Sequence, residues 1–216
     1  SRGYPTIGIR IALCLLFLHL WWLTEDYVGQ TIPSNTVPVS NLRDVGQDAT
    51  AWLAPALGAW VPALCTASSL LSELTVAVFF GMSILGSSFR PVLSIAITFI
   101  LRLAMRYATT LPYAEGAQWV TLPWMPTFFI IPEAANVFFS GRVALATVLA
   151  VELQHARRQL GSAASLLGAA VVGGNAALSL ALSVAWTAEL MVAILFALYA
   201  CRAAALLAPW VDAFMP

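Results

Sequence analysis

Residues 138–153 read FFSGRVALATVLAVEL, an apolar run interrupted near its start by one charged residue, Arg142. A helix needs about 20 mainly apolar residues to cross the hydrocarbon core of a bilayer. An arginine within such a helix costs several kcal/mol unless it faces the interior of a helix bundle or a polar cavity. This stretch therefore predicts a membrane helix whose arginine points toward neighbouring helices and away from lipid.

The composition of the whole chain supports the same class. Of 216 residues, 61% are hydrophobic and only 9% are charged, which is outside the usual range for a soluble domain. Ten arginines balance ten acidic residues, so no net charge points to nucleic acid. The three cysteines have no metal-type spacing and are interpreted as small apolar residues. We predict an all-α integral membrane protein with a single domain over 1–216.

Apolar runs of membrane-crossing length divide the chain into a predicted bundle of six transmembrane helices, at about 7–24, 68–87, 91–111, 138–156, 161–181 and 183–208. Residues 25–67 are expected to form a long external first loop followed by a helix that lies in the membrane interface. That helix is indicated by tryptophans and prolines at 52–62. In the fifth run, small residues every four positions predict close helix packing, at Gly161, Ser165, Ala169 and Gly173 and again at Ala164 and Gly168.

The distribution of arginines predicts the topology, because short cytoplasmic loops retain positive charge. Arginines flank alternate ends of the runs, at Arg2, Arg10, Arg90, Arg157, Arg158 and Arg202. The intervening loops are acidic, with Glu25, Asp26, Asp44, Asp48, Glu115 and Glu133. We therefore expect a multi-pass protein with both termini cytoplasmic, in a bacterial-type inner membrane or its equivalent.

Four charged residues within the runs are predicted to converge near the external side. Arg102 and Arg106 are four residues apart and share one face of the third helix. Arg142 and Glu189 lie near the outer starts of the fourth and sixth helices. Such a group is interpreted either as ion pairs that join helices or as the remains of a binding site.

Three stretches in order resemble the type 2 phosphatidic acid phosphatase superfamily, in particular its sphingomyelin-synthase-like branch. RLAMRYATTLP (102–112) is similar to that branch's arginine-containing helix, FFSGRV (138–143) to its Phe-Ser-Gly-His stretch, and SVAWTAELMVA (183–193) to its His-Tyr-Thr-x-Asp stretch. Ala185 follows Arg142 by 43 positions, similar to the separation of the family's two histidines. The resemblance covers roughly residues 65–205 and implies a six-helix fold.

The catalytic positions that the resemblance carries over are all changed in this chain. The family's nucleophilic histidine corresponds to Ala185, its orienting aspartate to Glu189, and its general-acid histidine to Arg142. Alanine cannot attack phosphorus, and an arginine cannot move a proton near neutral pH. We therefore expect no enzymatic activity and a degenerate catalytic site, that is, a pseudoenzyme.

The remaining charges favour a structural or a binding role. Arg142 is expected to form an ion pair with Glu189, and Arg102, Arg106 and Arg142 are the candidate ligands for a phospholipid head group, because planar guanidinium groups bind phosphate bidentately. The predicted function is that of an inactive accessory or structural subunit of a larger membrane complex. Its expected partners are membrane lipids and other membrane subunits, with no nucleic acid.

Two alternatives remain open at this point. One is an active lipid phosphatase or head-group phosphotransferase. The other is a pigment-binding membrane subunit, in which the imidazole of His19 ligates a chlorophyll-type pigment from the first helix. We otherwise expect no metal and no cofactor apart from a bound phospholipid.

Overall fold

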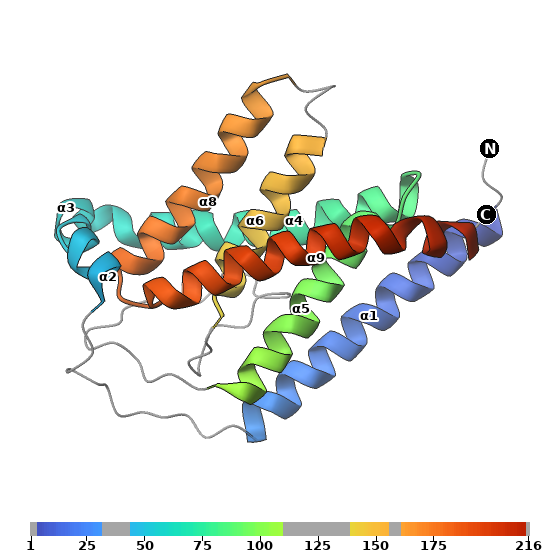
Figure 1. The fold of residues 1–216 in the computed structure, drawn as a ribbon, viewed down its shortest axis with the longest axis horizontal. Coiled ribbons are helices and arrows are strands. Elements are labelled where there is room, and N and C mark those ends of the chain that lie inside the picture. Colours follow the sequence, from blue (N-terminus) through green and yellow to red (C-terminus); the bar gives the residue numbers. More distant parts are fainter. Residues whose placement is uncertain (1–3, 32–43, 110–138, 156–160, 215–216) are drawn as a thin grey trace.

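The computed structural model describes residues 4–31, 44–109, 139–155 and 161–214, and this part of the chain is helical without strands (Figure 1). The elements are α1 (Tyr4–Thr31), α2 (Val45–Thr50), α3 (Leu53–Leu57), the 3-10 turn η1 (Gly58–Trp60), α4 (Val61–Leu85), α5 (Arg90–Ala108), α6 (Gly141–His155), α8 (Ala163–Ala181) and α9 (Thr187–Phe214). The prediction of an all-α fold is confirmed.

In the part of the chain that the structure describes, six long helices overlap the six predicted apolar runs. Within the described residues, four candidate membrane spans satisfy both length and hydropathy, namely Ile7–Thr24, Val45–Leu85, Ala163–Ala181 and Thr187–Phe214. α6 has 15 residues, which extend about 22 Å at 1.5 Å per residue and fall short of a hydrocarbon core about 30 Å thick. α5 contains Arg102 and Arg106, which lower its mean hydropathy. The structure therefore shows several potential membrane helices and leaves the count of six as a prediction.

The predicted loop and interfacial segment, 25–67, contains more helix than expected. α1 continues seven residues past the predicted end of the first run, to Thr31, and α4 begins at Val61, before the predicted start at 68. Between them, α2, α3 and η1 form short helical pieces. α3 ends just before Gly58, whose φ of 45° lies in the left-handed region. Pro62 sits in the first turn of α4, where the missing amide hydrogen is tolerated, so α4 can begin there.

Helices α4 and α9 run along the long axis of the molecule, and the other long helices cross or flank them (Figure 1). The start of α1 and the end of α9 lie at the same end, which we call the terminal end. α2 and the start of α9 lie at the opposite end, which we call the α2 end. These two ends contain most of the polar interactions discussed below.

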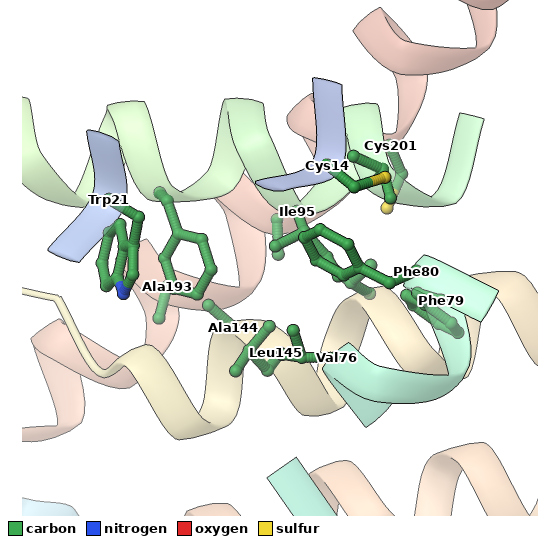
Figure 2. Packing of buried hydrophobic residues seen from close by; sticks show 14 of the residues in the cluster. Cys14, Trp21, Val76, Phe79, Phe80, Ile95, Ala144, Leu145, Ala193 and Cys201 are labelled. Carbon is green, nitrogen blue, oxygen red and sulfur yellow. The ribbon is translucent and has the colours of Figure 1, made fainter. Parts of the chain in front are cut away.

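An apolar core fills the space between the long helices (Figure 2). Trp21 of α1 packs on Phe99 of α5 with ring centroids 3.9 Å apart, and Phe17 stacks on Phe80 and Phe99. The small residues Ala144 and Ala193 let α6 and α9 approach the same core. Aromatic rings from α1 thus fill the gaps that the short side chains leave.

Close packing of α6 and α8 uses one of the two predicted small-residue stripes. A Cβ atom on Gly168 would lie 2.9 Å from Cα of Ala150 in α6, so the two backbones are in near contact there. Ala164, one turn earlier, is also buried. The other stripe does not take part in this contact, because Ala169 and Gly173 are exposed. The prediction of close packing is confirmed for the Ala164 and Gly168 face.

Candidate functional site

Residues next to the three degenerate catalytic positions meet in one buried cluster. Val143, Ala185 and Leu190 pack together where the start of α6 meets the start of α9. These residues are adjacent to or coincide with the positions singled out in the sequence, Arg142, Ala185 and Glu189. All three of those side chains are buried, with 6%, 5% and 5% of their surface exposed. The fold therefore brings these positions into the same region.

Arg102 of α5 reaches the same region. Its side chain is buried and lies directly against Gly141, where an added Cβ atom would be 3.2 Å from Nε. Its guanidinium carbon lies 5.7 Å from the centroid of the Trp21 ring, a distance at which the cation is attracted to the aromatic face. Gly141 thus leaves room for Arg102 beside the first turn of α6. The predicted phosphate ligand Arg106 has a side chain outside the described residues.

The carboxylate of Glu189 has a defined structural role. Its Oε2 accepts a hydrogen bond of 3.2 Å from the backbone N–H of Trp186, three residues earlier. This is one half of a capping box, in which a side chain in the first helical turn satisfies an amide before it. Arg102, Arg142 and Glu189 each make further interactions in the fold. The Arg142–Glu189 ion pair stays a prediction.

A residue that the sequence reading counted only as an external charge, Asp44, joins two helix starts. Its Oδ1 accepts from the backbone N–H groups of Gly46 and Gln47 at 2.9 and 3.0 Å, which caps α2. The same carboxylate accepts from the backbone N–H of Thr187 at 2.7 Å and from the Thr187 hydroxyl at 2.5 Å. One carboxylate therefore satisfies amides at the N-termini of both α2 and α9, where the helix dipoles favour negative charge.

The electrostatics of Asp44 follow from these contacts. Partial burial by itself raises the pKa of this carboxyl, but the hydrogen bonds from the Thr187 hydroxyl and from three backbone amides outweigh it. The pKa of Asp44 is consequently held below its ordinary value, and the group is ionised at neutral pH. An ionised carboxylate can accept all four hydrogen bonds at once.

Two further contacts seat α2 on the turn before α9. Gln47 donates from Nε2 to the carbonyl oxygen of Ala185 at 2.9 Å. Gly46 lies so close to α9 that an added Cβ atom would overlap the Thr187 hydroxyl and would meet Leu180 at 3.3 Å. Only glycine fits there without displacing α2. The N-terminus of α9, next to Ala185, is thus covered by a short helix.

The terminal end is held by a different group of contacts around Arg10. This side chain is 1% exposed and donates from Nη1 to the carbonyl oxygens of Ser83 and Gly86 at 2.7 and 3.0 Å. Its Nη2 lies 3.3 Å from Oδ1 of Asp212, near the end of α9. The same Asp212 oxygen accepts from the backbone N–H of Phe89 at 2.8 Å, just before α5. Arg10 and Asp212 therefore connect α1, α4, α5 and α9.

A second ion pair lies close to the terminal end. Nη2 of Arg90 and Oε2 of Glu152 are 2.5 Å apart, and the glutamate is buried. This pair explains how a glutamate is accommodated within the apolar run of α6. The pair lines a cavity of about 310 Å³ together with Met82, Gly86, Ser87, Ser88 and Pro91.

An apolar groove, also of about 310 Å³, lies between α4 and α8. Its wall includes Leu64 and Leu71 of α4 and Ala170 and Leu178 of α8. The Ser68 hydroxyl donates to Oδ1 of Asn175 at 2.5 Å, and both side chains are buried. This hydrogen bond fastens α8 to α4 beneath the groove.

Both histidines are exposed, whereas the residues of the candidate site are buried. His19 is exposed on α1. His155 is the last residue of α6, where Nδ1 lies 2.9 Å from the carbonyl oxygen of Val151. It follows Arg142 by thirteen residues of the same helix, which corresponds to about 20 Å along the axis. Among the described residues, no three side chains from histidine, cysteine, aspartate and glutamate form a metal-binding group.

Comparisons with known proteins supply no relative from which to assign the site. No family model matches the chain, and neither the curated proteins nor the solved structures contain a significant match. The resemblance to phosphatidic acid phosphatases therefore stays a prediction from three short stretches.

Proposed function

We propose that this chain is a catalytically inactive, phosphatidic-acid-phosphatase-like membrane protein that holds a phospholipid head group and serves as an accessory subunit of a larger membrane complex. The observation that carries the proposal is the position of Arg102. It lies beside Gly141, adjacent to Arg142, in the region where Ala185 occupies the nucleophile position. Two buried guanidinium groups on neighbouring helices are suited to a phosphate anion.

The local chemistry supports binding without turnover. Ala185 has no atom that could attack phosphorus, and Arg142 remains protonated at neutral pH. Glu189 accepts a hydrogen bond from the backbone N–H of Trp186, and both histidines are exposed, outside the buried site. A phosphate held by the arginines would therefore meet no activated nucleophile.

The proposed topology has six crossings with both termini on the cytoplasmic side. Contact between Arg10 near the chain's start and Asp212 near its end supports an even number of crossings, because both lie at one end of the molecule. In this arrangement α5 and α6 cross the membrane with their buried charges directed toward the other helices. The arginine cluster, formed by Arg102 and Arg142, lies toward the external side.

Binding of an anionic lipid is tested by native mass spectrometry of the protein released from nanodiscs containing phosphatidate and phosphatidylcholine. We expect retention of phosphatidate by the native protein and a loss of about tenfold in Arg102→Met, because one charge-assisted phosphate contact is removed. Arg202→Met is the matched control, since Arg202 is exposed on α9. Equal retention of phosphatidate by the native protein and by Arg102→Met contradicts the binding proposal.

Absence of turnover is tested with phosphatidate and with head-group donor and acceptor lipids in mixed micelles. We expect release of phosphate and transfer of head groups at the rate of protein-free micelles. Activity above that rate that disappears in Glu189→Gln would show that the site is an active one.

The accessory role is tested separately by purification in mild detergent, with a stoichiometric second membrane subunit as the expected result and a lone monomer as the contrary one.

A further inference from the structure

Helix α2 covers the first turn of α9 yet has no buried residue of its own. Val45 is 77% exposed, and the apolar clusters described above include no residue of α2. Its attachment to α9 depends on polar contacts from Asp44 and Gln47 and on the close approach of Gly46. A short helix held in this way belongs to the segments that open most easily.

The turn before α9, to which Gln47 of α2 donates a hydrogen bond, is well shielded. Ala185 and Trp186 are 5% and 8% exposed although they lie in a non-helical turn between α8 and α9. Gln47 donates a hydrogen bond to the carbonyl oxygen of Ala185, and the Asp44 carboxylate accepts one from the backbone N–H of Thr187. The amide end of α9, which is the end of a helix that attracts anions, is therefore already filled by a carboxylate from the same chain.

We infer that α2 is a plug: it docks on the first turn of α9 through Asp44 and Gln47, shields Ala185 and its neighbours from water, and opens when the Asp44–Thr187 contacts break. In its docked state the Asp44 carboxylate takes the position of an external anion at the α9 N-terminus. Opening exposes this N-terminus beside the buried arginine cluster. The inference rests on the proposed function only for the identity of the ligand that would gain access.

Undocking of α2 from α9 is expected to be reversible because polar contacts hold the two helices together. The polar contacts between α2 and α9 can be exchanged for contacts with water, and α2 gives up no buried side chain of its own when it leaves. Other charged or titratable groups close to the plug are Asp48 on α2 itself and Glu189 on α9. Neither provides the α9 amide contact that Asp44 makes. Loss of the Asp44 carboxylate should therefore release α2 while the long helices keep their packing.

The test measures how fast a single cysteine at the shielded turn reacts with a charged methanethiosulfonate reagent. Ala185→Cys is placed in a background in which the buried Cys14, Cys65 and Cys201 are replaced by alanine. Addition of Asp44→Ala should raise the labelling rate about tenfold or more, because two helix-capping interactions are lost. Thr50→Ala is the matched control, since the hydrogen bonds described for its hydroxyl stay within α2. It should leave the rate unchanged.

Thr187→Val provides an independent route if Asp44→Ala does not fold. It removes the hydroxyl contact of 2.5 Å and keeps the backbone amide, and we expect an intermediate rise in labelling. Equal labelling rates with and without these substitutions would overturn the plug, whether the introduced thiol reacts quickly or slowly. Because the readout contains no lipid, this result is distinguishable from a failure of the native protein to retain phosphatidate.

Discussion

The two ends of the bundle fasten their helices by different means. At the terminal end, Arg10 is almost fully buried, bonded to two carbonyl oxygens and paired with Asp212. At the α2 end, Asp44 is partly exposed and binds backbone amides and a hydroxyl. A cation placed against helix C-termini and an anion placed against helix N-termini both match the helix dipoles. Because Arg10 is buried and Asp44 is partly exposed, we expect the Arg10 contacts to break only when the bundle unfolds. The Asp44 contacts can break while the long helices stay packed.

The largest effect is expected from Arg10→Ala. This change leaves the carbonyl oxygens of Ser83 and Gly86 and the Asp212 carboxylate without their buried donor, which costs about 3 kcal/mol in the free energy of unfolding. Thermal unfolding in detergent measures the loss. Arg202→Ala removes an exposed arginine and should stay within about 0.5 kcal/mol of the native protein. Similar melting temperatures for the two variants would show that Arg10 is not a fastening.

A smaller effect is expected from Asp44→Ala, about 2 kcal/mol, because N-caps contribute about 1 kcal/mol each and this residue caps two helices. The same thermal measurement applies. Asp44→Asn keeps an acceptor oxygen and should recover about half of the loss. If Asp44→Ala destabilised the protein more than Arg10→Ala does, the contrast between the two ends would be reversed.

The pH dependence of stability distinguishes the ends further. The folded pKa of Asp44 lies below its ordinary value, so its contribution is complete above about pH 4, the unfolded value. It is lost progressively as the pH falls through the folded pKa. The difference in melting temperature between the native protein and Asp44→Asn should therefore stay constant from neutral pH down to about pH 5 and shrink as the pH falls below about 4. A constant difference would contradict the assignment, and other carboxyl groups cancel because both proteins contain them.

The smallest change in stability is expected at the contact between α6 and α8, which involves neither a charged group nor a helix cap. Gly168→Ala places a methyl group 2.9 Å from the backbone of Ala150, and separation of α6 from α8 should cost about 1 kcal/mol. Gly173→Ala is the matched control, because an added Cβ atom there meets no atom within 4 Å. It should be neutral or slightly stabilising, as alanine favours the helix. Equal destabilisation by both changes would refute the α6–α8 contact.

Hydropathy was sufficient to predict where the long helices lie, because apolar runs of this length have few alternatives to helix. It was not sufficient to count the crossings. α6 is short and α5 carries arginines, so their relation to the membrane depends on neighbours that a single segment does not reveal. The sequence predicted from the topology that Arg102, Arg106, Arg142 and Glu189 converge at one depth, and the structure packs Val143, Ala185 and Leu190, next to two of these residues, into one cluster.

The residues that the sequence reading missed act through distant partners. Arg10 was assigned to a positive loop, whereas it is buried against α4 and Asp212. Asp44 was counted as an external charge. Its spacing to Gln47 resembles a helix N-cap and could have predicted α2, but its contact with Thr187 joins residues 143 positions apart. Local patterns contain no information about such a contact.

The Arg10–Asp212 contact also sets a waiting time during synthesis. Its partners are 202 residues apart in the chain, so at about 5–20 residues per second the second arrives roughly 10–40 s after the first. Throughout that interval the arginine of the first helix has no carboxylate from the last one. A chain that stops short of Asp212 therefore keeps the buried Arg10 without the carboxylate that pairs with it in the full bundle.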